Sequence, residues 1–110
     1  MEELLENVEE FLESGEENLL KKRYNVAVSD FFKAIVILAD YLIYREIKVM
    51  PKSHNERFSL LNKYFKEIYE RVSELFKTYT KSYNLRLNRY EALKVGDYAN
   101  ELKKFIINKE

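Results

Sequence analysis

The chain has 110 residues, of which 46% are hydrophobic and 35% are charged, and its formal net charge is zero. Two glycines and one proline are too few for a turn-rich all-β fold, and the lack of cysteine excludes disulfides and thiolate chemistry. With a single histidine in the chain, a structural zinc site is nearly excluded as well.

The amino-terminal segment is acidic and amphipathic. Residues 2–17 hold eight glutamates and no base, an arrangement that complements the dipole of a helix start. Apolar residues at intervals of three and four predict a helix over residues 2–22. Gly15 either divides this helix or, as we expect, marks a close approach of its backbone to a neighbour. The segment lacks the basic start and apolar core of a signal peptide, so we expect a cytoplasmic location.

The most apolar segment, RYNVAVSDFFKAIVILADYLIYREIKV, predicts a second helix with Asn25 as its N-cap. Apolar residues surround this helix nearly completely, which is typical of a central helix or of one covered by a second copy of the chain. Lys33, Asp40 and Arg45 interrupt it, so no membrane span is expected. We interpret the helix as core plus the interface of a homodimer.

Pro51 closes the second helix, and Ser53 and Glu56 then have the spacing of a capping box that starts a third. Apolar residues keep a helical spacing through Phe58, Leu61, Phe65, Ile68, Val72, Leu75 and Phe76. The same phase continues to Tyr79, Tyr83, Leu87 and Tyr90. One very long helix fits this pattern, but a kink near Thr78–Thr80 is favoured because a short domain must fold back on itself.

A last helix is expected to start at Gly96 and Asp97, with an apolar face from Tyr98 to Ile106. Five helical segments follow from these patterns. The predicted fold class is all-α, an antiparallel up-and-down helical bundle of four to five helices, in a single domain of residues 1–110.

The stretch KTYTKSYNLRLNRYEALK, residues 77–94, holds five bases, three tyrosines and one acid. If it is helical, its tyrosines form an inward seam and its lysines and arginines are solvated, and helical spacing favours this interpretation. Arg86 lies three residues from Tyr83 and four from Tyr90, close enough to lie against either ring. The alternative is therefore a basic and aromatic surface for phosphate or an exposed base.

His54 is the single imidazole and hence the single ordinary general base near neutral pH. It falls in the first turn of the third helix, where an exposed residue beside a capping box is the simpler interpretation. The chain has no Ser, His and Asp arrangement, no glycine-rich phosphate loop and no acidic cluster with metal-ligand spacing. We therefore predict no catalytic residues, no metal site and no cofactor.

Three segments in order resemble the HEPN (higher eukaryotes and prokaryotes nucleotide-binding) domain family: LLKKRYNVAVSDFFKAIVILADYLI, PKSHNERFSLLNKYF and LFKTYTKSYNLRLNRYEA. They are similar to that family in a basic-aromatic entry to the second helix, a Pro-Lys-Ser-His before the third, and an Arg with a Tyr four residues later. The resemblance implies a helical bundle, commonly a homodimer, that is associated with RNA or nucleotides. It also implies a minimal nucleotidyltransferase as partner, in a pair of toxin–antitoxin type.

Many HEPN proteins resemble metal-independent ribonucleases that use an Arg and a His four to six residues after it. Here Arg86 is present, but Tyr90 stands four residues on and no His follows residue 54. The motif is incomplete, and the leading hypothesis is a non-catalytic module that binds a nucleotide, RNA or a nucleotidyltransferase partner. Its candidate residues are Arg86, Asn88, Arg89, Tyr90 and His54. The alternatives are a degenerate ribonuclease that uses His54 with Arg86, and a purely structural helical dimer.

Overall fold

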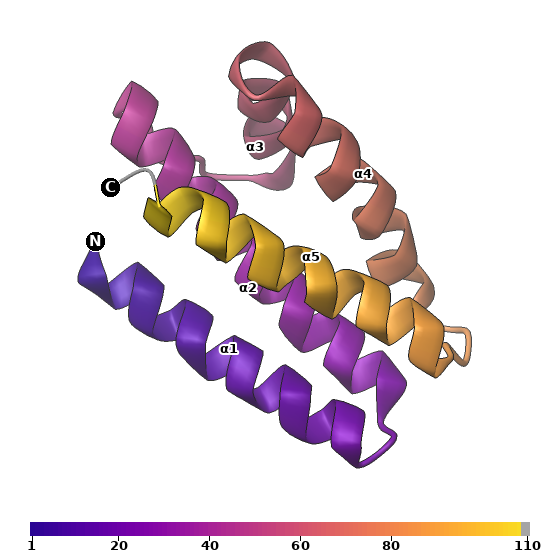
Figure 1. The fold of residues 1–110 in the computed structure, drawn as a ribbon. Helices are drawn as coiled ribbons and strands as arrows, with labels where there is room; N and C mark the ends of the chain where they lie inside the picture. The colour runs from indigo at the N-terminus through magenta and orange to yellow at the C-terminus, as the bar shows by residue number, and fades with distance from the viewer. Residues whose placement is uncertain (109–110) are drawn as a thin grey trace.

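A computed structural model describes residues 1–108, and it folds these residues into five α-helices without strands (Figure 1). The helices are α1 (Glu2–Leu20), α2 (Tyr24–Ile47), α3 (His54–Tyr64), α4 (Lys66–Lys81) and α5 (Arg89–Asn108). The all-α helical bundle predicted from the sequence is confirmed. Among the residues described, no helix has both the length and the apolar content needed to cross a membrane.

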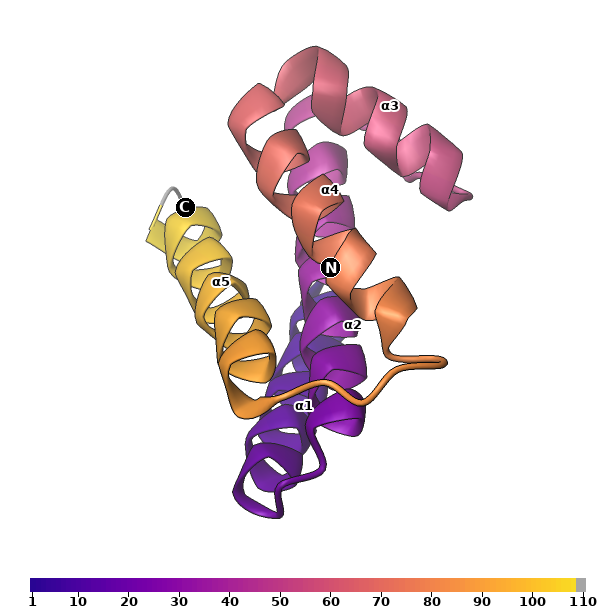
Figure 2. The same cartoon turned by 90° about the vertical axis from the view of Figure 1, so that its right-hand side faces the viewer.

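Helix α2 is the central element of the bundle. It packs against each of the other four helices, with α1 and α5 on one side and α4 on the other (Figures 1 and 2). The short helix α3 lies at a steep angle to α2 at one end of the bundle (Figure 2). The apolar composition of α2 predicts a central position, and the other four helices of the same chain already provide it. The homodimer interface stays a prediction.

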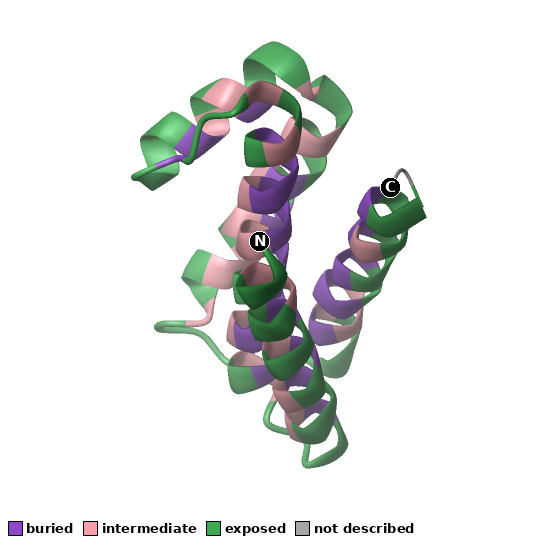
Figure 3. Cartoon of the chain, turned by 90° about the vertical axis from the view of Figure 1, so that its left-hand side faces the viewer, coloured by how far each residue is buried: buried purple, intermediate pink, exposed green. Residues whose placement is uncertain are grey.

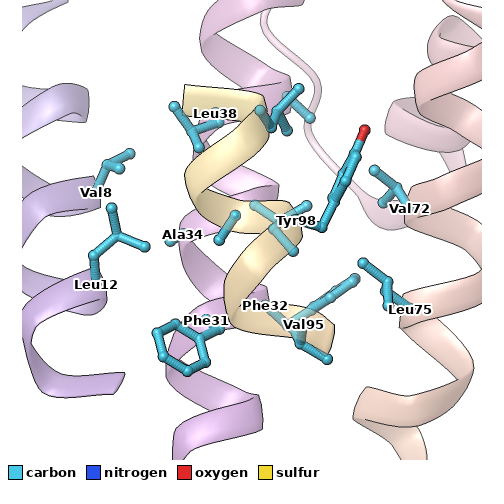
Figure 4. Close-up of a cluster of buried hydrophobic side chains, with 14 of the residues drawn as sticks. Val8, Leu12, Phe31, Phe32, Ala34, Leu38, Val72, Leu75, Val95 and Tyr98 are labelled. Carbon is cyan, nitrogen blue, oxygen red and sulfur yellow. The ribbon is translucent and has the colours of Figure 1, made fainter. Parts of the chain in front are cut away.

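The core forms where α1, α4 and α5 meet α2 (Figure 4). Val8 and Leu12 approach it from α1, and Val72 and Leu75 approach it from α4. All of these side chains are buried against the middle of α2, where Phe31, Phe32, Ala34, Ile35 and Leu38 are at most 1% exposed. Burial of this apolar surface is the main favourable contribution to folding.

Both glycines of the chain lie inside helices and face the same ring. A Cβ atom added to Gly15 of α1 would lie 2.5 Å from Cε1 of Phe31, and one added to Gly96 of α5 would lie 2.8 Å from Cε2. The close approach predicted at Gly15 is confirmed. The expectation that Gly96 starts the last helix is wrong, because this residue lies within α5 and is buried.

The last helix begins earlier than expected, at Arg89, because a second capping box starts it there. The backbone N–H of Glu91 donates to Oδ1 of Asn88 at 2.9 Å, and the Asn88 N–H donates to Oε1 of Glu91 at 3.0 Å. This reciprocal pair satisfies backbone donors that a helix start leaves free. At the predicted capping box the Glu56 N–H donates to Ser53 Oγ at 3.1 Å, whereas the Glu56 carboxylate accepts from the Lys52 N–H at 3.0 Å and not from that of Ser53.

The predicted long third helix is divided at Phe65 rather than kinked near Thr78–Thr80. Phe65 has φ −140° and ψ 63°, outside the helical region, yet its N–H still donates to the Leu61 carbonyl at 2.7 Å. Because the interruption is a single residue, the three-and-four spacing of apolar residues crosses it unbroken. Helix α4 then continues through both threonines and ends at Lys81.

Candidate functional site

Residues 82–88 form the connection between α4 and α5, and the side chain of Asn25 holds it in place. The Asn25 Nδ2 group donates to the carbonyl of Ser82 at 2.8 Å and to that of Leu85 at 2.6 Å. Its Oδ1 accepts from the Leu87 N–H at 2.9 Å. The prediction that Asn25 caps α2 is wrong, since α2 begins at Tyr24 and this amide instead pairs backbone groups about 60 residues away. The loop is thereby fixed to the start of the central helix.

The tyrosine seam predicted for residues 77–94 ends at Tyr79. Leu87 is buried, but Tyr83 is 74% exposed and Tyr90 is 72% exposed. Helical spacing does not apply here, because residues 82–88 lie outside the helices. The interpretation of Tyr83 and Tyr90 as seam residues is therefore wrong.

We call residues 81–90, KSYNLRLNRY, the basic–aromatic segment. Lys81, Arg86 and Arg89 are exposed, and the segment contains no acidic residue. The next residue, Glu91, is engaged in the capping box with Asn88. Most of the segment lies at the surface of the loop that projects from one side of the bundle (Figure 3). It thus presents three cations and two exposed rings to solvent.

His54 lies elsewhere, at the first position of α3, in a groove between α1, α2, α3 and α4. We call it the His54 groove; it measures about 450 Å³. Its lining residues are Phe11, Phe32, Lys33, Val36, Ile37, Lys52, Ser53, His54, Arg57 and Tyr79. Neither Arg86 nor any residue from 88 to 90 is among them. The structure therefore does not bring all the predicted site residues to one groove.

An ion pair orients His54. Arg57, which is 8% exposed, donates from Nε to Asp40 Oδ1 at 2.6 Å and from Nη2 to Asp40 Oδ2 at 2.9 Å. Its Nη1 lies 2.9 Å from Nδ1 of His54. A guanidinium can only donate, so Nδ1 accepts this hydrogen bond and the ring proton of a neutral His54 is on Nε2. Asp40 and Arg57 thus leave His54 with a hydrogen-bond donor.

The charges lining the His54 groove are all positive. Lys33, Lys52 and Arg57 line it, the charge of Arg57 being paired with Asp40, and its described lining includes no carboxylate. Two other grooves differ: one is lined by Glu2, Glu6, Glu9 and Lys103 among others, and one by Glu67, Glu101 and Arg71 among others. The His54 groove is therefore the one of these three suited to an anion.

Tyr79 connects the His54 groove with the basic–aromatic segment. Its ring stacks on Phe32 with centroids 4.8 Å apart, and its hydroxyl lies 2.8 Å from that of Tyr83. This hydrogen bond, together with partial burial, raises the pKa of Tyr79 to about 12. Tyr79 thus places its ring in the lining of the groove and its hydroxyl against a residue of the loop.

Asp40 and Arg57 are not among the site residues predicted from the sequence, although the sequence carries a signal for each. Asp40 interrupts an apolar helix, and Arg57 follows His54 by three residues, which places the two on one face of α3. The pairing of Asp40 with Arg57 could not be predicted, because the two residues are 17 apart in the sequence and lie on different helices. Within residues 1–108, no three side chains of His, Cys, Asp or Glu are grouped as metal ligands would be.

Comparisons with protein-family models, with curated proteins and with solved structures find no match for this chain. The resemblance to the HEPN family therefore stays a prediction.

Proposed function

We propose that the chain is a non-catalytic module that binds single-stranded RNA through its basic–aromatic segment. The observation that carries the proposal is the exposure of Tyr83 and Tyr90 in a stretch with three cations and no acid. Exposed rings offer stacking surfaces to bases of any sequence, and arginines and lysines pair with the backbone phosphates. The resemblance to the HEPN family supports the same class of ligand.

The geometry around this segment favours a rigid binding surface. Asn25 fastens three backbone groups of the loop, and Asn88 caps the helix that carries Arg89 and Tyr90. Asn88, one of the predicted contact residues, therefore has a structural role. Because the loop is held before the ligand arrives, binding loses less conformational freedom than ordering a mobile loop would.

The proposal is tested by titrating a fluorescent single-stranded RNA of about ten nucleotides and following its anisotropy. The double variant Arg86→Ala/Arg89→Ala should bind at least about tenfold more weakly. The slope of log affinity against log salt should also fall by about 1.4, since each lost phosphate contact contributes about 0.7. The matched control is Lys63→Ala/Lys104→Ala, which removes two exposed cations outside the segment and should bind normally.

Equal affinities for the wild type and Arg86→Ala/Arg89→Ala would contradict the assignment of the site. Absence of RNA binding by the wild-type chain would overturn the proposed function. A minimal nucleotidyltransferase, the partner that the resemblance implies, would then be assayed against the same two variants.

A ribonuclease is the second candidate, and the contact between His54 and Arg57 favours it. The structure supplies His54 with an arginine at 2.9 Å, although this is Arg57 and not the Arg86 expected from the sequence. Incubation of purified protein with labelled RNA in the presence of a chelator distinguishes the two functions. Cleavage that disappears in His54→Ala would establish the ribonuclease and refute a non-catalytic role.

A further inference from the structure

We infer that the His54 groove binds the terminal phosphate monoester of the RNA strand held by the basic–aromatic segment. This inference rests on the proposed function and adds a preference for a phosphorylated chain end. It is carried by the donors of the groove, by its size and by its connection to the segment through Tyr79.

The donors come from three parts of the chain. Lys33 extends from α2, Lys52 from the connection between α2 and α3, and His54 from the start of α3. Arg57 contributes indirectly, because its guanidinium is held by Asp40 and by Nδ1 of His54. It is a positioning residue that leaves the Nε2–H of a neutral His54 as a donor.

This set of donors matches a terminal phosphate better than an internal one. A phosphate monoester carries close to two negative charges near neutral pH and has three strong acceptor oxygens. An internal phosphodiester carries one charge and has two unesterified oxygens. Two lysines and one imidazole N–H correspond in charge and number to the monoester.

The remaining lining suits the nucleoside that carries the phosphate. Phe11, Phe32, Val36, Ile37 and Tyr79 give the groove an apolar and aromatic side. A volume of about 450 Å³ lies within the range of small-ligand pockets, about 300–1,000 Å³. The groove therefore has room for the last nucleotide of a strand.

The two surfaces meet at Tyr79 and Tyr83. The hydroxyls of Tyr79 and Tyr83 lie 2.8 Å apart, with Tyr79 in the lining of the groove and Tyr83 in the segment. A strand stacked on Tyr83 would thus have one end beside the groove. Whether this is the 5′ or the 3′ end is decided by the experiment.

The test compares three RNAs of one sequence that carry a 5′-phosphate, a 3′-phosphate or hydroxyls at both ends, each with the same internal fluorophore. One phosphorylated RNA should bind the wild type on the order of tenfold tighter than the hydroxyl RNA. Lys33→Gln/Lys52→Gln should lose this preference and keep its affinity for the hydroxyl RNA within about twofold. Lys63→Gln/Lys104→Gln, the matched control, should retain the preference.

Equal binding of the three RNAs by the wild type would overturn this inference and leave the proposed function intact. A preference that persists in Lys33→Gln/Lys52→Gln would overturn it in the same way, because the phosphate would then bind elsewhere. If none of the three RNAs binds, the proposed function and this inference are both wrong. Thermal unfolding of each variant shows that it is folded under the conditions of the titration.

Discussion

The backbones of Gly15 and Gly96 enclose the ring of Phe31 from two helices, an arrangement that we call the Phe31 clamp and that makes a specific prediction about Gly15. In Gly15→Ala the new Cβ atom would lie 2.5 Å from Cε1 of Phe31, whereas ordinary van der Waals contacts begin near 3.4 Å. The ring would have to move by nearly 1 Å. It has little room to do so, because the backbone of Gly96 approaches the same ring from α5, where an added Cβ would lie 2.8 Å from Cε2. The substitution therefore overpacks the core.

Two opposing effects set the magnitude. Overpacking of a core costs about 1–3 kcal/mol, and a ring approached closely by two backbones belongs in the upper part of that range. Replacing glycine by alanine inside a helix stabilises by about 1 kcal/mol. The free energy of unfolding of Gly15→Ala should therefore fall by about 1–2 kcal/mol, which lowers the melting temperature by about 5–10 °C.

Urea titration of four proteins tests this reasoning: the wild type, Gly15→Ala, Phe31→Leu and the double variant. Leucine has no ring at the point of collision, so Gly15→Ala should cost less in the Phe31→Leu background. Glu16→Ala, an exposed substitution in the same helix, serves as control and should change stability by less than about 0.5 kcal/mol. A stabilised Gly15→Ala, or additive effects in the double variant, would refute the clamp.

Three further predictions follow from polar contacts. Asp40→Asn leaves the buried charge of Arg57 uncompensated and should lower the free energy of unfolding by about 3 kcal/mol in urea; a change below about 1 kcal/mol would contradict the role of the pair. Asn25→Ala removes the partner of three loop backbone groups, so hydrogen exchange of the loop amides should accelerate and the free energy of unfolding should fall by about 1–3 kcal/mol. Unchanged exchange and stability would show that water replaces the Asn25 amide and would contradict its role. Two tyrosines have a pKa raised from 10.0 to about 12: Tyr79, through its hydrogen bond and partial burial, and Tyr98, through burial. The folded chain therefore keeps these protons at a pH where the unfolded chain loses them. The stability that the two hydroxyls contribute should be fully present below pH 10 and should be lost as the pH rises from 10 to 12. In an ultraviolet titration, Tyr79→Phe and Tyr98→Phe should each lose one late-ionising group, and retention of both would refute the assignment.

Local sequence signals predicted much of the fold. The cap at Ser53 depends on a few neighbouring residues, and the structure confirms that Ser53 Oγ accepts from the Glu56 N–H. Helix α2 ends before Pro51, as expected, although its last residue is Ile47 and Lys48 adopts the left-handed conformation there. The apolar composition of α2 correctly predicts its buried central position. The same kind of signal is present at Asn88, three residues before Glu91, whereas the last helix was expected to start at Gly96. Since Gly96 serves close packing against Phe31, its purpose depends on another helix and could not be read locally.

The candidate site was harder to predict for a related reason. Helical periodicity placed Tyr83 and Tyr90 in the core because it assumes that the helix continues, and the loop after Lys81 breaks that assumption. Asn25 holds this loop by hydrogen bonds to residues about 60 positions away, and Asp40 of α2 forms an ion pair with Arg57 of α3. Such pairings are properties of the folded chain.

The central claim is that RNA binds at the basic–aromatic segment, and an NMR titration of the ¹⁵N-labelled chain with single-stranded RNA tests it most directly. The account predicts that amide shifts will change most from residue 81 to residue 90, with smaller changes near Lys52 and His54. Changes confined to the opposite surface of the bundle, on the outer face of α1, or no changes at all, would contradict it.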